Sequence, residues 1–123
     1  MQTNEIRIAI NVPVQEVFEY TLDPKNTPQW VPDCIEMHTD TEQIGVGTKY
    51  INEHVAREVT DYAQNQFLEL SDVDGVYVCS YSFRKIDEGS TELIFFELNE
   101  DGSKLEPPME ERFFQNLKKV LEK

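Results

Sequence analysis

The chain opens with a β-strand pattern that runs directly into a helix pattern, and this order constrains the fold more than any other feature. Residues 4–12 alternate between apolar and polar side chains, as expected for a strand with one buried face. Pro13 suits the first turn of a helix, where its missing N–H has no partner to lose. Residues 14–22 then have apolar side chains at helical spacing, and Pro24 ends that helix. The apolar face of the strand carries Ile6, Ile8, Ile10 and Val12.

The middle of the chain predicts an antiparallel meander. Residues 25–32 form a short second helix or turn that presents Trp30. Frequent turn signals then separate short runs that are typical of strands. The expected strands cover residues 35–42, 48–55, 57–63, 67–71, 76–86 and 91–98.

The end of the chain predicts a long amphipathic helix. Pro107 and Pro108 open it, and glutamates near its start with lysines near its end complement the helix dipole. Its apolar stripe is Met109, Phe113, Leu117 and Val120. The elements together predict an α+β fold in a single domain, residues 1–123. That domain consists of a curved antiparallel sheet of about six to seven strands, two short helices after the first strand, and the C-terminal helix.

Composition excludes several function classes. With 24 acidic and 11 basic residues the net charge is −13, so we expect no nucleic-acid binding. The sequence has neither an apolar run of about 20 residues nor a signal-peptide pattern, so we expect no membrane span and a cytoplasmic location. Cys34 and Cys79 fit a reducing compartment. The acidic surface serves solubility or offers a docking face to a basic protein partner.

Four short motifs in this order resemble the START-like superfamily, also called SRPBCC or polyketide cyclase/dehydrase-like, which includes the birch-pollen-allergen fold. The motifs are residues 8–18, the Asp23-Pro24-x-Asn26 segment before Trp30, the Gly45-Val-Gly47-Thr48 turn, and residues 117–122. The resemblance implies the helix-grip fold, in which a curved sheet surrounds a C-terminal helix and leaves an apolar cavity. It also implies diverse functions, including ligand carriage, aromatic cyclisation and chaperone activation.

Polar side chains on one predicted strand are candidate site residues. Tyr50, Asn52 and His54 share a face by period-2 alternation. If that face looks inward, His54 enters the cavity as a candidate acid or base, and Tyr50 and Tyr81 are weaker catalytic candidates. If that face looks outward instead, the His54 side chain lies in solvent.

Aromatic side chains are candidate ligand contacts. Tyr77, Tyr81 and Phe83 share one face of the long strand, where large rings suit either a pocket or ordinary core packing. Trp30 is expected at the mouth of the cavity and Phe113 on the helix that closes it. The expected ligand-binding set is therefore Trp30, Tyr50, Asn52, His54, Tyr77, Tyr81, Phe83 and Phe113.

No metal-ligand spacing or phosphate-binding loop is present in the sequence, so we expect no metal and no cofactor. The leading hypothesis is binding of a small hydrophobic or amphipathic ligand in the cavity. One alternative is a cyclase or dehydratase-type enzyme that uses the cavity histidine and tyrosines. The other is a protein-interaction module similar to chaperone ATPase activators.

Overall fold

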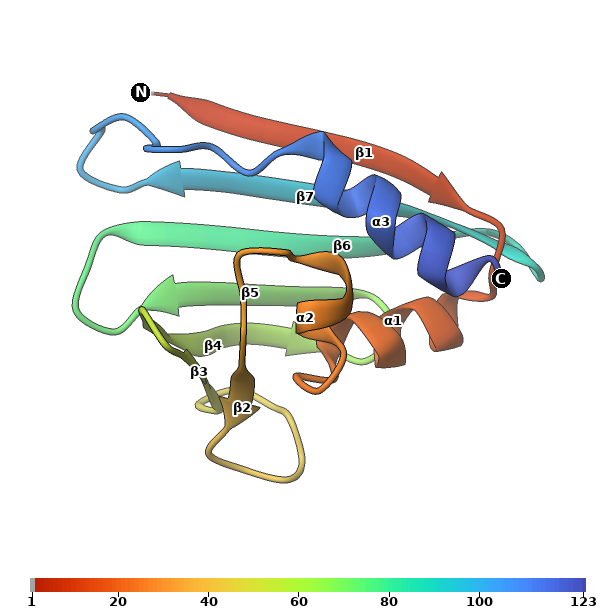
Figure 1. Ribbon diagram of the computed structural model, residues 1–123, viewed down its shortest axis with the longest axis horizontal. Coiled ribbons are helices and arrows are strands. Elements are labelled where there is room, and N and C mark those ends of the chain that lie inside the picture. The colour runs from red at the N-terminus through yellow and green to blue at the C-terminus, as the bar shows by residue number, and fades with distance from the viewer. Residues whose placement is uncertain (1) are drawn as a thin grey trace.

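The chain folds into one antiparallel sheet with helices on one of its faces (Figure 1). The computed structural model describes residues 2–123. Within that range seven strands pair in the order β1-β7-β6-β5-β4-β3-β2, so the first and last strands lie side by side. This arrangement confirms the predicted α+β fold. The strands are β1 (Thr3–Ile10), β2 (Met37–Thr39), β3 (Lys49–Asn52), β4 (Ala56–Ala63), β5 (Phe67–Asp72), β6 (Tyr77–Asp87) and β7 (Ser90–Asn99).

The opening of the chain forms the predicted strand and helices. In β1, Ile6 and Ile10 are buried while the residues between them include exposed Arg7, because alternate side chains point to opposite faces of the sheet. Helix α1 (Val14–Leu22) follows Pro13 and is followed by its C-cap residue Asp23, next to Pro24. Helix α2 (Thr27–Trp30) is the short second helix. The sequence pattern therefore located all three elements.

The C-terminal helix starts later than predicted. Helix α3 spans Glu111–Leu121, so Pro107, Pro108 and Met109 precede it. The backbone of Met109 is engaged by the sheet, because its N–H donates to the Glu97 carboxylate and its carbonyl accepts from the Asn4 side chain. These tertiary hydrogen bonds hold the segment outside the helix.

Strands β2 and β3 are shorter than predicted. Strand β3 ends at Asn52 because the Asn52 Oδ1 accepts hydrogen bonds from the backbone N–H groups of His54 and Val55, at 2.7 and 2.8 Å. Such an Asx turn satisfies the backbone without a strand partner. The segment before β2 is likewise held by a side chain, since the Glu53 carboxylate accepts from the Ile35 N–H at 3.0 Å.

The core lies between the helices and the face of the sheet that they cover. Phe114 is fully buried there, with its ring centroid 5.4 Å from Trp30 and 5.2 Å from Phe95. Phe113 is 5% exposed and has the Arg112 guanidinium 4.7 Å above its ring. Phe114 rather than Phe113 therefore forms the centre of the apolar stripe of α3. The predicted stripe ran through Phe113, and the packing of Phe114 corrects that prediction by placing position 114 at its centre.

Candidate functional site

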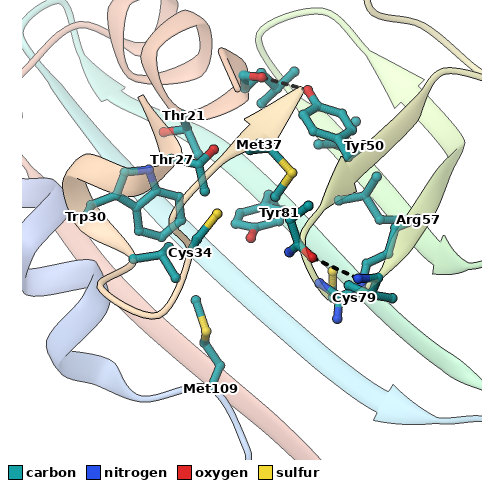
Figure 2. Close-up of a pocket in the computed structure, with 16 residues that line it drawn as sticks. Thr21, Thr27, Trp30, Cys34, Met37, Tyr50, Arg57, Cys79, Tyr81 and Met109 are labelled. Carbon is teal, nitrogen blue, oxygen red and sulfur yellow. Dashed lines mark hydrogen bonds between the residues drawn. The ribbon is translucent and has the colours of Figure 1, made fainter. Parts of the chain in front are cut away.

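A cavity of about 140 Å³ lies between the sheet and the helices (Figure 2). Its floor comes from strands β3 to β6, and its walls come from α1, α2 and the segments beside β2 and α3. The lining residues are Thr21, Leu22, Thr27, Trp30, Val31, Cys34, Met37, Tyr50, Asn52, Val55, Arg57, Leu68, Leu70, Cys79, Tyr81 and Met109. Most of these side chains are apolar or aromatic, as is common for small-molecule sites.

Tyr50 fixes one wall of the cavity. Its hydroxyl donates a 2.7 Å hydrogen bond to the carbonyl oxygen of Leu22, at the last residue of α1. Burial raises the pKa of the Tyr50 hydroxyl well above its ordinary value, because desolvation disfavours the phenolate. Tyr50 therefore joins β3 to α1 as a neutral hydrogen-bond donor, and its ring faces the cavity.

Arg57 is the charged residue among those that line the cavity. Its Nε donates to the Asp72 carboxylate at 2.8 Å, and its guanidinium lies 4.5 Å from the centre of the Tyr77 ring. Arg57 also lines a neighbouring groove of about 510 Å³. The guanidinium thus stands at the boundary between the apolar cavity and this more polar groove.

A buried carboxylate lines the same groove and accepts hydrogen bonds from three other segments. Glu97 is 2% exposed and accepts hydrogen bonds from the Asn4 side chain at 2.8 Å, the Tyr77 hydroxyl at 2.5 Å and the Met109 N–H at 2.5 Å. A buried carboxylate is tolerated when its oxygens are hydrogen-bonded in this way. Glu97 therefore ties β1, β6 and the segment before α3 together.

The thiols of the cavity are weak nucleophiles. Cys34 and Cys79 are both free and buried. Burial raises the pKa of the Cys79 thiol to about 12 and also raises that of Cys34. Since the thiolate is the reactive form, both side chains are neutral parts of the wall at physiological pH.

The structure brings together four of the predicted ligand contacts. Trp30, Tyr50, Asn52 and Tyr81 all line the cavity. Tyr77 and Phe113 line the neighbouring groove instead. Phe83 is a core residue whose ring packs edge-on against Phe18, with centroids 5.0 Å apart.

His54 lies outside the cavity. It is exposed in the turn that follows β3, so it does not share a strand face with Tyr50 and Asn52. The inward placement of His54 was wrong because the Asn52 side chain ends the strand two residues earlier. The structure therefore agrees with the alternative in which the His54 side chain lies in solvent.

Several cavity residues were not predicted. Arg57 is two residues from fully buried Val59 on β4, so period-2 alternation could have placed its side chain on the inward face. Met109 had been assigned to the helix stripe, and Thr21 lies on α1 without any distinguishing motif. Only a tertiary arrangement could place these two at the cavity.

The described residues give no sign of a metal centre or a spanning helix. Between residues 2 and 123 no group of three histidine, cysteine, aspartate or glutamate side chains is arranged to hold a metal ion. No helix in the same range is long and apolar enough to cross a membrane.

Comparisons with known proteins find the fold but no close relative in sequence. No protein-family model matches the chain, and no curated protein matches its sequence significantly. The Aha1 dimer from Colwellia psychrerythraea is 14% identical with a TM-score of 0.71, over 99% of this chain and 97% of that chain. EF2215 from Enterococcus faecalis, a conserved protein of unknown function, is 21% identical with a TM-score of 0.70, over 98% of this chain and 71% of that chain.

A third similar structure is PFC0360w, an HSP90 activator from Plasmodium falciparum. It is 15% identical with a TM-score of 0.67, over 80% of this chain and 74% of that chain. At such identities the similarity concerns the fold, and fold alone does not determine activity. The chain therefore shares the fold of these proteins, and this fold is the helix-grip arrangement that the resemblance to the START-like, or SRPBCC, superfamily implied.

Proposed function

We propose that this protein binds a small hydrophobic or amphipathic molecule in the cavity between its sheet and its helices. The cavity of about 140 Å³ and its mainly apolar lining carry this proposal. An engineered apolar cavity of about 150 Å³ in another protein binds benzene, so a single six-membered ring is the expected size of the ligand body.

The lining supports binding more than acid–base catalysis. His54, the candidate base, lies in an exposed turn. Burial raises the pKa of Tyr81 well above its ordinary value, so its hydroxyl remains protonated at neutral pH. An acid–base catalyst needs a pKa near the working pH, and the cyclase or dehydratase alternative therefore lacks its proposed proton carriers.

Thermal unfolding with benzene tests the proposal. A ligand that binds only the folded state raises the melting temperature by mass action, so we expect a concentration-dependent rise. Leu70→Phe adds ring volume to the wall of the cavity and should abolish the rise. Ile94→Phe makes a similar addition on β7, on the face of the sheet that points away from the cavity, and should retain the rise in melting temperature. No rise in the natural chain, or an equal rise in Leu70→Phe, would contradict cavity binding.

A second candidate is docking to a basic protein partner as a chaperone cofactor. The net charge of −13 and the structural similarity to an HSP90 activator favour it. Stimulation of ATP hydrolysis by purified Hsp90 is the test. Stimulation that is lost at high salt would support electrostatic docking, and unchanged hydrolysis would remove this candidate.

A further inference from the structure

Arg57 lies where the apolar cavity meets the polar groove beside it. Of the residues that the structure describes, Arg57 and Met109 are the two that line both spaces. Period-2 alternation with buried Val59 directs the Arg57 side chain to the face of the sheet that the helices cover. This side chain is nevertheless 32% exposed, so a ligand that occupies the cavity or its junction with the groove can touch it.

The guanidinium of Arg57 uses only part of its hydrogen-bonding capacity. An arginine has five N–H donors, and Nε of Arg57 alone donates to Asp72, at 2.8 Å. By contrast, Arg112 binds the Glu110 carboxylate through both Nε and Nη2. Between residues 2 and 123 Nη1 and Nη2 of Arg57 have no hydrogen-bond acceptor, and neither belongs to the unpartnered side-chain atoms that are fully buried. These two nitrogens are therefore unpaired and accessible.

The charge of Arg57 acts on the cavity itself. It opposes the effect of burial on the pKa of the Cys79 thiol and of the Tyr81 hydroxyl, two groups on the cavity wall. Figure 2 shows Arg57, Cys79 and Tyr81 together among the residues that surround the space. The apolar cavity therefore has a positive charge at one place on its wall.

No acidic side chain in the described part of the chain lines the cavity, although the sequence contains 24 acidic residues. The carboxylates nearest to this position line the groove and are engaged, because Asp72 holds Nε of Arg57 and Glu97 accepts three hydrogen bonds. The other charged residues of the groove are exposed, namely Asp33, Lys104, Glu106 and Glu110. A negative group that enters from the cavity thus meets Arg57 as the charged residue of the wall.

The two free nitrogens match the geometry of a carboxylate. Arginine presents parallel N–H groups that bind both oxygens of a carboxylate at once. A carboxylate that leaves water needs such an ion pair and its hydrogen bonds, since an unpaired buried charge is costly. A neutral ligand would leave Nη1 and Nη2 of Arg57 without a charged partner.

We propose that the ligand is a small monocyclic carboxylate whose ring fills the cavity and whose carboxylate binds Nη1 and Nη2 of Arg57. This inference rests on the proposed function and adds the chemical class of the ligand and its orientation. The ring lies against Leu70, Cys79 and Tyr81 on the sheet. The carboxylate lies at the junction of the cavity with the groove, and Asp72 holds the guanidinium in place through Nε.

Benzoate and nitrobenzene test the charge of the ligand, because they have nearly the same shape and only benzoate is an anion. Binding in the cavity is read from the backbone amide signals of Leu70 and Cys79 in ¹H–¹⁵N spectra. Benzoate should bind the natural chain at least about tenfold more tightly than nitrobenzene, as expected for hydrogen bonds between charged groups. A smaller ratio, or a preference for nitrobenzene, would overturn the carboxylate assignment.

An arginine variant tests the position of the carboxylate. Arg57→Met keeps much of the apolar length of the side chain and removes the guanidinium, so benzoate affinity should fall about ten- to hundredfold. Nitrobenzene affinity should stay unchanged, which also reports that the variant is folded. Arg84→Met is the matched control, because Arg84 likewise donates Nε to a strand carboxylate, that of Glu92, but is exposed and outside the cavity lining.

The control variant removes the same charge and should alter neither affinity. An equal loss of benzoate affinity in Arg57→Met and Arg84→Met would reveal a general effect of net charge. An equal loss for both probes in Arg57→Met would reveal a packing effect. Either result would overturn the role of Arg57, and the comparison of the two probes in the natural chain does not depend on how well a variant folds.

The same titrations separate this inference from the proposed function. If neither probe moves the amide signals of Leu70 and Cys79 at millimolar concentration, cavity binding fails and the carboxylate assignment fails with it. If nitrobenzene moves them and binds as tightly as benzoate, cavity binding stands and the carboxylate assignment is overturned.

Discussion

Truncation of Phe114 tests how the C-terminal helix closes the core. Phe114 is fully buried and packs against Trp30, Phe95 and Tyr81, with ring centroids 5.4, 5.2 and 6.4 Å away. Phe→Ala substitutions in cores cost about 3–5 kcal/mol, and each aromatic pair adds about 0.5–1.5 kcal/mol. We therefore expect Phe114→Ala to lower the free energy of unfolding by about 4–5 kcal/mol. This loss is a large share of the stability of about 5–15 kcal/mol that is typical of small proteins.

Urea unfolding followed by circular dichroism measures this loss, with the slope of the transition checked for two-state behaviour. Phe113→Ala is the matched control on the neighbouring position. Phe113 is 5% exposed and lines the open groove, so its truncation should cost about 1 kcal/mol less. A larger loss in Phe113→Ala than in Phe114→Ala would refute the placement of Phe114 at the centre of the core.

Three further predictions concern other parts of the molecule. Burial raises the pKa of Cys79 from its ordinary 9.0 to about 12, so the unfolded chain loses this proton first. The free energy of unfolding should fall as the pH rises between these values, at up to about 1.4 kcal/mol per pH unit. Urea unfolding at several pH values measures this fall, and a fall in Cys79→Ala as steep as in the natural chain would contradict the prediction. Glu97→Leu removes the acceptor of three hydrogen bonds and should lower the free energy of unfolding by about 3 kcal/mol in the same assay. The control Glu42→Gln, at an exposed position, should lower it by about 0.5 kcal/mol or less, and equal losses in the two variants would contradict the prediction. His54→Ala should leave benzene affinity unchanged by calorimetric titration, and a measurable loss would place His54 in the site.

The fold was predictable because its main signals are local. The alternating residues of β1, Pro13 and Asp23-Pro24 specify a strand, a helix start and a helix end within a short stretch of chain. The turn signals between strands then require antiparallel neighbours. These features identified the order of elements without any knowledge of tertiary contacts.

The errors arose where a side chain satisfied the backbone in place of a regular element. Asn52 ends β3 and turns His54 outward, and Glu97 holds Met109 outside α3. The later start of α3 was a tertiary effect, because the N–H of Met109 bonds to a residue 12 positions earlier in the chain. Neither hydrogen bond changes the spacing of apolar residues, so a sequence pattern does not reveal it.

The candidate site was predictable only in part. Alternation along the strands identified Tyr50 and Tyr81 as inward residues, and the cavity contains both. The inward position of Arg57 follows from its alternation with buried Val59, but its ion pair with Asp72, 15 residues away, cannot be seen in the sequence. The volume of the cavity depends on how completely the side chains of several elements fill the space between them, which single-residue patterns do not specify.

A crystal structure of the protein under xenon pressure tests the central claim most directly. Xenon enters dry apolar cavities of this size, and its electron density is unambiguous. The account predicts one xenon site bounded by Leu70, Cys79 and Tyr81, and the loss of that site in Leu70→Phe. Side chains that fill this space, with no xenon between the sheet and α2, would contradict the existence of a ligand-binding cavity.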